Sequence, residues 1–169
     1  MLPDSQPDHA PGAPKIDLTS NDYFMNEALR QAHLAYDAGE VPIGAVIVRE
    51  NKVIARAYNQ VELLKDATAH AEMLALTQAA AALGDWRLEG CTLFVTKEPC
   101  PMCAGAIVLA RVTRLVFGVR DSRAGGAGSV FPIATFGGLN HTVEVVAGVQ
   151  EAATRDLLQS FFREKRRSE

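Results

Sequence analysis

Two short segments contain the residues that could perform chemistry. One is His70-Ala71-Glu72, and the other is Pro99-Cys100-Pro101-Met102-Cys103. Imidazole and thiolate groups are common zinc ligands, so His70, Cys100 and Cys103 form a candidate metal-ligand set. A structural zinc site normally closes with four protein ligands, whereas a catalytic site uses three and leaves the fourth position to water. The residue types therefore predict a catalytic site for one Zn²⁺ ion per subunit.

Glu72 is the expected catalytic residue of this site. Zinc lowers the pKa of a bound water toward about 7, and a nearby carboxylate can take its proton and deliver it to a leaving group. In the first turn of a helix that points at the ion, a long Glu side chain can reach that water while the shorter His70 binds the metal. Two alternatives stay open on these residues alone: Glu72 is an ordinary exposed surface residue, or the two cysteines form a redox pair.

The other cysteine and histidines fit structural roles better. Cys91 begins an apolar run and is expected to be a small core residue. His9 falls in a polar N-terminal stretch, His33 in a helix, and His141 near the start of a strand, where a hydrogen-bonded polar group is the common case. None of them is expected to complete the metal site.

The elements that must position these residues follow from hydrophobic spacing and turn signals. Apolar residues at helical spacing predict helices, and short β-branched runs predict strands. Residues 118–138 contain six of the 13 glycines and show no clear period, which indicates a long loop or a loop with a short helix. The expected order is a helix over 22–38, strands over 43–49 and 52–58, a helix from Thr68 to about residue 83, a strand over 91–96, a helix over 101–109, strands over 114–117 and 142–146, and a helix over 151–167.

This order predicts an α/β protein, a three-layer α/β/α sandwich around a mixed five-stranded sheet. Thr68 is the expected N-cap of the second helix, and Cys100 caps the third with Pro101 at its first position. Helix N-termini gather at the carboxyl edge of the sheet in such a layout, so the two chemical segments are expected to meet there. Cys103 lies one turn after Cys100, so both sulfurs face the same side of the helix.

Composition limits the class of protein. The chain has 169 residues, of which 48% are hydrophobic and 22% are charged, and this is typical of one globular domain. Charged residues interrupt every apolar stretch before membrane-spanning length, so no membrane segment is expected. Residues 1–20 carry four prolines among polar residues and lack a signal-peptide pattern, which indicates a flexible tail before a single domain over 21–169. Three cysteines, two of them three residues apart, favour the reducing cytoplasm.

The charge is unevenly distributed along the chain. The formal net charge is −3, yet after residue 100 there are nine Lys and Arg against six Asp and Glu. These basic residues could line one face that meets phosphates, and the alternative is a solvated surface with a polar C-terminal end.

On these motifs the sequence resembles the zinc-dependent nucleoside and nucleobase deaminase superfamily, whose signature is His-x-Glu followed by Pro-Cys-x-x-Cys. The similarity to the bacterial tRNA adenosine deaminase family within it extends over about residues 22–166 and implies a cytidine deaminase-like fold. It also implies hydrolytic deamination of the wobble adenosine in a tRNA anticodon loop to inosine, with release of ammonia, by a homodimer without a nucleotide cofactor. The similar segments are 40–45, 68–72, 86–93, 117–121, 128–129, 139–141 and 161–163.

The resemblance assigns four further residues to substrate binding. Asn59 is expected to hydrogen-bond the flipped base, and Ile43 to form an apolar wall of the adenine pocket. Asp121 is expected to contact the ribose, and Phe162 to lie near a flanking base. From position alone, Asn59 also fits a turn, Ile43 an ordinary strand core, and Phe161 or Phe162 the apolar side of a helix.

Two other functions compete with this one. A free nucleobase deaminase acting on guanine or cytosine would share the metal signature, and a zinc-stabilised RNA-binding module would keep the fold without catalysis. The loop over 120–129 favours an RNA substrate, and so does the segment Phe161-Phe162-Arg163 of the last helix, which is followed by Lys165-Arg166-Arg167. The intact Glu72 favours an enzyme.

Overall fold

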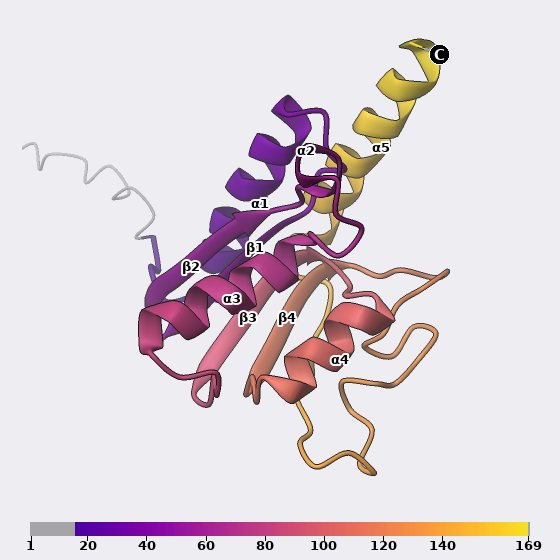
Figure 1. Cartoon of the computed structure of the whole chain (residues 1–169). Helices are drawn as coiled ribbons and strands as arrows, with labels where there is room; N and C mark the ends of the chain where they lie inside the picture. Colours follow the sequence, from indigo (N-terminus) through magenta and orange to yellow (C-terminus); the bar gives the residue numbers. More distant parts are fainter. Residues whose placement is uncertain (1–15, 169) are drawn as a thin grey trace, which may run out of the picture.

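The computed structural model describes residues 16–168 of the chain (Figure 1). Most of the segment 1–20, which was expected to be a flexible tail, lies outside the described residues. Just before the first helix, the hydroxyl of Ser20 accepts a hydrogen bond from the Tyr23 N–H at 3.1 Å. This contact caps helix α1 (Asn21–Asp37), because it satisfies one of the N–H groups that have no partner inside the helix.

Five strands form one mixed sheet in the order β2-β1-β3-β4-β5. Strand β1 pairs antiparallel with β2 and β3, whereas β4 pairs parallel with β3 and β5. The β3–β4 pair is parallel because a helix crosses between the two strands and returns the chain to the same edge of the sheet. The strands are β1 (Gly44–Arg49), β2 (Lys52–Tyr58), β3 (Cys91–Lys97), β4 (Arg114–Val119) and β5 (Glu144–Val146).

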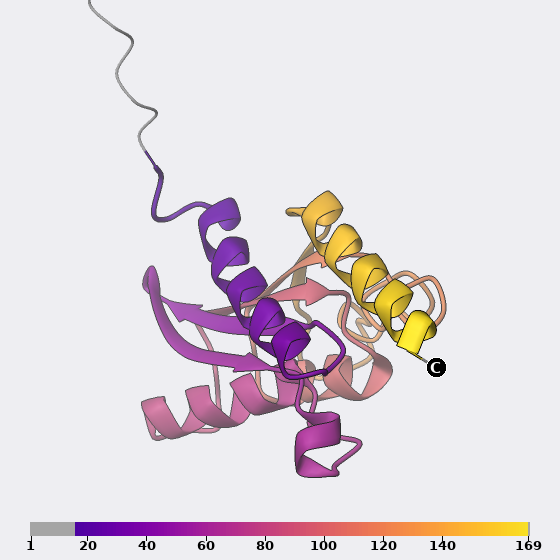
Figure 2. The same cartoon turned by 90° about the horizontal axis from the view of Figure 1, so that it is seen from above.

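Helices cover both faces of this sheet, with α1 and α5 on one side and α3 and α4 on the other (Figure 2). Along β1, Ala45 and Ile47 belong to the core under α3 and α4, whereas Val46 and Val48 pack against α1. The predicted three-layer α/β/α sandwich is therefore confirmed. Within residues 16–168, no helix is both long and apolar enough to cross a bilayer. The remaining helices are α2 (Val61–Leu64), α3 (Ala71–Leu83), α4 (Pro101–Leu109) and α5 (Glu151–Ser168).

Two local features differ from the prediction. The helix expected to begin at Thr68 begins at Ala71, and His70 is its N-cap residue. The N–H and hydroxyl of Thr68 instead donate to the carboxylate of Asp66, at 2.8 and 2.7 Å, and this local pairing competes with a cap at Thr68. The segment before it, expected to be a plain loop, contains the short helix α2.

The connection from β4 to β5 is a long loop over residues 120–143 that contains no helix. One isolated bridge, between Ala127 and Pro132, gives it a tight bend. The N–H of Gly126 donates to the Pro99 carbonyl at 2.7 Å, so this loop is attached directly to the start of α4. The loop therefore borders the segment that contains both candidate ligand cysteines.

Candidate metal and catalytic site

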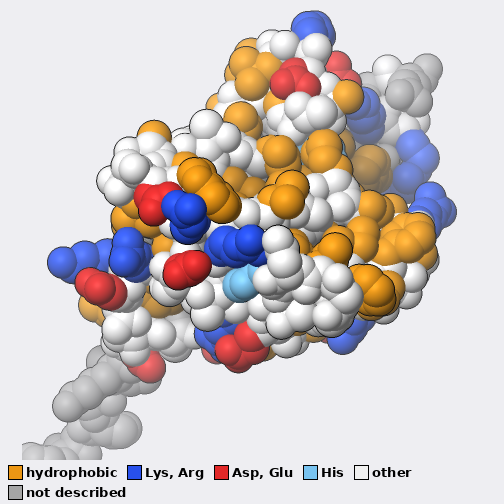
Figure 3. Space-filling view, turned by 60° about the horizontal axis from the view of Figure 1, so that its bottom comes forward, with side chains coloured by type: hydrophobic (Ala, Val, Ile, Leu, Met, Phe, Trp, Pro, Cys, Tyr) orange, Lys and Arg blue, Asp and Glu red, His pale blue; other side chains and the backbone are white. Residues whose placement is uncertain are grey.

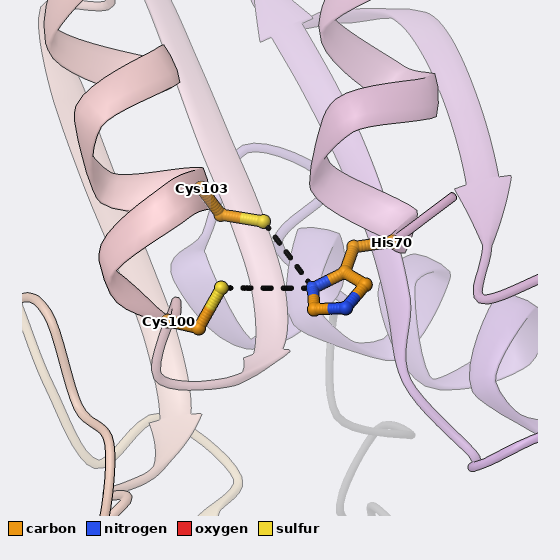
Figure 4. A group of neighbouring side chains, drawn as sticks. All are labelled: His70, Cys100 and Cys103. Carbon is orange, nitrogen blue, oxygen red and sulfur yellow. Dashed lines mark hydrogen bonds between the residues drawn. The ribbon is translucent and has the colours of Figure 1, made fainter. Parts of the chain in front are cut away.

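His70, Cys100 and Cys103 lie together although they come from two different helices (Figure 4). The Nδ1 atom of His70 is 3.7 Å from the Cys100 sulfur and 3.5 Å from the Cys103 sulfur. Their ligand atoms all lie within 4.8 Å of one another, and no other His, Cys, Asp or Glu of residues 16–168 joins this group. One imidazole nitrogen and two sulfurs at this spacing fit a zinc ion held by three protein ligands.

The helix starts place these side chains. His70 is the N-cap of α3 and Cys100 is the N-cap of α4, yet neither side chain makes a capping hydrogen bond. Both side chains are therefore available to face each other across the gap between the two helices. Cys103 follows one turn later on α4 and points toward the same imidazole (Figure 4). The expectation that the two segments meet at the helix N-termini is confirmed.

The electrostatics of the group favour a thiolate at Cys100. The hydrogen bond from the Cys103 thiol lowers the pKa of Cys100 to about 4, against the opposing effect of burial. The same hydrogen bond raises the pKa of Cys103, since that thiol is the donor. Thiolate is the form of cysteine that binds metals, so one ligand is already prepared at neutral pH.

Glu72 lies in the first turn of α3 and is only 4% exposed. This burial excludes the interpretation of Glu72 as an ordinary surface residue. Burial also raises the pKa of its carboxyl above the usual range, because the charged form loses its hydration. A carboxyl group with a raised pKa exchanges its proton more readily near neutral pH, which suits a proton carrier.

A cavity of about 220 Å³ opens beside the ligand group and is lined by both His70 and Glu72. The structure places Asn59 and Ile43, two of the expected substrate residues, in the wall of this cavity. Lys165 reaches the same cavity from α5. The other lining residues are Gly39, Glu40, Val41, Val61, Glu62 and Ala71.

Glu40, a residue with no predicted role, orients Asn59 through a buried hydrogen bond. The buried carboxylate of Glu40 accepts hydrogen bonds from the N–H groups of Glu62 and Leu63, at 3.1 and 2.7 Å, and from Asn59 Nδ2 at 3.4 Å. Because an ionised carboxylate only accepts, Asn59 must direct its NH₂ group toward Glu40. The signal available in the sequence was a charged residue beside the apolar run over 41–48.

Asp121 and Phe162 do not line the cavity beside His70. The Asp121 carboxylate pairs with Lys97 and accepts the N–H of Arg123 at 2.9 Å. Although burial works against it, the Lys97 hydrogen bond holds the pKa of Asp121 below its usual range. One carboxylate oxygen of Asp121 is therefore engaged by Lys97 at the end of β3, and the other accepts N–H groups of its own loop.

Phe162 lines a second cavity, of about 600 Å³, between the 120–143 loop and α5. Arg123, Arg163 and Arg166 also line this cavity, so its surroundings are basic. Phe162 is 43% exposed, whereas Phe161 is 7% exposed and packs its ring against Tyr36. Of the two aromatic residues, Phe161 is the core residue. The remaining lining residues are Leu158 and Gln159.

The histidines and the cysteine outside the ligand group have structural surroundings. Cys91 is fully buried in the core, and His141 Nε2 lies 2.7 Å from the Val112 carbonyl oxygen, as expected for a core residue and a satisfied polar group. His33 is exposed on α1, and His9 lies outside the described residues.

Comparisons with known proteins agree with this geometry. Residues 19–166 match a family model described as MafB19-like deaminase. The "tRNA-specific adenosine deaminase" of Bacillus subtilis is 49% identical over 150 residues, which is 89% of this chain and 93% of that protein. A solved structure from a study of tRNA:A34 deaminases that edit A to I at the wobble position of transfer RNA has a TM-score of 0.77 at 41% identity, and the match covers 80% of this chain and 98% of the other. The guanine deaminase of Nitrosomonas europaea has a TM-score of 0.73 at 26% identity, over 89% of this chain and 88% of the other.

Proposed function

Because this chain belongs to the family of tRNA-specific adenosine deaminases, we propose that it hydrolyses the wobble adenosine of a tRNA anticodon to inosine and releases ammonia. The observation that carries the proposal is the buried Glu72 in the same cavity wall as His70 of the His/Cys/Cys group. The identity to the Bacillus subtilis tRNA-specific relative is 49% over 89% of this chain. It exceeds the 26% to the guanine deaminase of Nitrosomonas europaea and the 38%, over 64% of this chain, to a guanine deaminase of Bacillus subtilis, which favours this function over free nucleobase deamination.

We propose that one Zn²⁺ ion per subunit is held by His70, Cys100 and Cys103. When bound, such an ion supplies Lewis-acid activation of a water molecule. Glu72 takes a proton from the attacking water, delivers a proton to the ring nitrogen of adenine, and then protonates the departing amine. The new C6–O bond replaces the C6–N bond, and one water is consumed for each ammonia released. The support for these roles is the donor set, together with the place of Glu72 in the cavity wall beside His70.

The adenine base is proposed to enter the 220 Å³ cavity. Asn59 would hydrogen-bond the base with the amide atoms that Glu40 leaves available, and Ile43 would form an apolar wall. Asp121 would accept a hydrogen bond from a ribose hydroxyl in place of one of its contacts with Lys97 or with the Arg123 N–H. An anticodon loop suits such a cavity, because its bases are already unpaired and cost little to extrude.

The basic cavity beside α5 supports binding of the flanking nucleotides. Three arginines surround it, and the ring of Phe162 is exposed at its wall. Arginine side chains neutralise phosphates, and an exposed aromatic ring stacks on a base. These features distinguish an RNA-binding deaminase from one that acts on a free base.

The enzyme is proposed to be a cytoplasmic homodimer without a nucleotide cofactor. The surface over α3 and α4 supports the dimer, since Trp86 and Leu109 are 54% and 71% exposed and line an apolar depression with Met73, Leu76 and Ala80. Figure 3 shows apolar side chains gathered over a broad area of one side of the molecule. Sedimentation at micromolar protein concentration tests this state, and a fully active monomer would refute it.

One assay tests the function directly. The zinc-loaded protein is incubated with an anticodon stem-loop that carries a wobble adenosine, with free adenosine, and with free guanine. We expect inosine from the stem-loop at a far higher kcat/KM than from free adenosine. Robust turnover of guanine with no inosine from the RNA would refute the proposal in favour of a free-base deaminase.

A further inference from the structure

Glu98 is a buried carboxylate beside the segment that contains Cys100 and Cys103, and it takes no part in the proposed chemistry. It lies two residues before Cys100 and is 2% exposed. Its carboxylate accepts the N–H groups of Asp121 at 2.9 Å, Ala127 at 3.2 Å and Ser129 at 3.0 Å, and also the Ser129 hydroxyl. Four donors from one loop therefore converge on a single side chain, and no cation of the described residues forms an ion pair with it.

The loop over residues 121–129 approaches this carboxylate so closely that two glycines are required. A Cβ atom at Gly125 would lie 2.5 Å from the carboxyl carbon of Glu98. A Cβ atom at Gly126 would lie 2.9 Å from the carbonyl oxygen of Cys100. Neither glycine has a positive φ, so the need at these positions is space for packing and not backbone freedom. The loop is thus fitted against Glu98 and against the turn that contains the first ligand cysteine.

We propose that Glu98 is a positioning residue that holds the 121–129 loop in the conformation that binds RNA. Glu98 touches neither the 220 Å³ cavity nor the basic cavity, so it acts through the loop. The loop contributes Arg123 to the basic cavity and contains Asp121, whose carboxylate also accepts the Arg123 N–H. Releasing the loop from Glu98 removes the anchor of both residues at once. This inference rests on the proposed RNA substrate but concerns binding and not the chemical step.

The variant Glu98→Gln tests the anchor with almost no change in side-chain volume. Its NH₂ group must face some of the four loop donors, so at least one acceptor is replaced by a donor. Glu89→Gln is the matched control, because Glu89 is an exposed residue with no hydrogen bond among those of the described residues. Gly125→Ala is a second variant that displaces the carboxylate without changing its charge.

Three measurements are made on each zinc-loaded protein. Amide hydrogen exchange at residues 121, 127 and 129 reports the anchor, and fluorescence anisotropy with a labelled anticodon stem-loop reports RNA binding. Elemental analysis reports the bound metal. In Glu98→Gln we expect exchange at the three amides to be at least tenfold faster, the Kd for RNA to rise about tenfold or more, and the zinc content to stay at the wild-type value. Gly125→Ala is expected to shift the same amides and the Kd in the same direction, and Glu89→Gln to shift neither.

Specific outcomes would overturn the inference. The inference is wrong if the RNA Kd of Glu98→Gln stays within twofold of the wild-type value. It is also wrong if this variant loses zinc while its RNA binding is unchanged, because Glu98 would then support only the turn that contains Cys100. If Glu98→Gln does not fold, Ser129→Ala is measured in its place. This substitution removes the Ser129 hydroxyl and leaves the Glu98 carboxylate with three of its four donors. We expect the RNA Kd to rise about threefold, and an unchanged Kd refutes the inference. A wild-type protein that binds RNA but makes no inosine refutes the proposed function and leaves this inference standing if the Kd still depends on Glu98.

Discussion

Replacing Glu72 with Gln is the most direct test of the proposed chemistry. The substitution keeps the volume of a side chain that is 4% exposed, so the fold and the three metal ligands are expected to remain intact. It removes the only group proposed to carry protons between water, ring nitrogen and leaving amine. The buried position gives bulk water little access to substitute for the carboxylate. A positioned acid or base typically contributes about 10²- to 10⁴-fold to the rate.

We therefore expect kcat for an anticodon stem-loop to fall about 10³-fold, which corresponds to about 4 kcal/mol of transition-state stabilisation. The RNA Kd and the zinc content are expected to stay at wild-type values, because Glu72 is neither a ligand nor part of the basic cavity. Glu62→Gln is the control, since Glu62 lines the same cavity but has a side chain that is 68% exposed. If Glu72→Gln keeps its zinc and loses less than tenfold in kcat, the proton-carrier role is wrong.

The remaining predictions concern the metal, the core and the RNA surface. Cys103→Ala is expected to release the metal and abolish activity, and one zinc per chain by elemental analysis would contradict the ligand assignment. Gly44→Ala places a Cβ atom 2.1 Å from a main-chain oxygen of α1, and it should cost about 1–3 kcal/mol in urea unfolding. Gly105→Ala, in the open surroundings of α4, should stabilise by about 0.5–1 kcal/mol, and equal effects at the two glycines would refute the packing argument. Phe161→Ala should lower the free energy of unfolding by about 3 kcal/mol. Phe162→Ala should change it by less than about 0.5 kcal/mol and weaken RNA binding, and the reverse ranking of the two would contradict the assigned positions.

Local signals in the sequence predicted most elements because their causes are local. Pro101 at the start of a helix and the spacing of apolar residues act within one or two turns of chain. The long loop before β5 and the cap at Cys100 were predicted for the same reason. The predicted start of α3 was wrong, because Thr68 donates its N–H and hydroxyl to Asp66 and does not cap the helix. The N-cap residue is His70, and the sequence alone does not show that Asp66 engages Thr68.

Helix α2 could not be predicted from its own four residues. Its first N–H groups are satisfied by Glu40, which lies 22 and 23 positions before Glu62 and Leu63. An isolated helix of this length is unstable in water, because the cost of forming the first turn is not recovered. Its existence therefore depends on a buried carboxylate supplied from another part of the fold.

By itself, the sequence determined the candidate ligands and the carboxylate beside them, since residue type and spacing decide which side chains can bind zinc or carry a proton. The tertiary structure alone decided which acidic residues are buried and what they hold. Glu40 orients Asn59, and Glu98 gathers the donors of the 121–129 loop, through contacts between residues 19 to 31 positions apart. Burial and long-range hydrogen bonds arise only when distant segments pack together, and no local pattern records them.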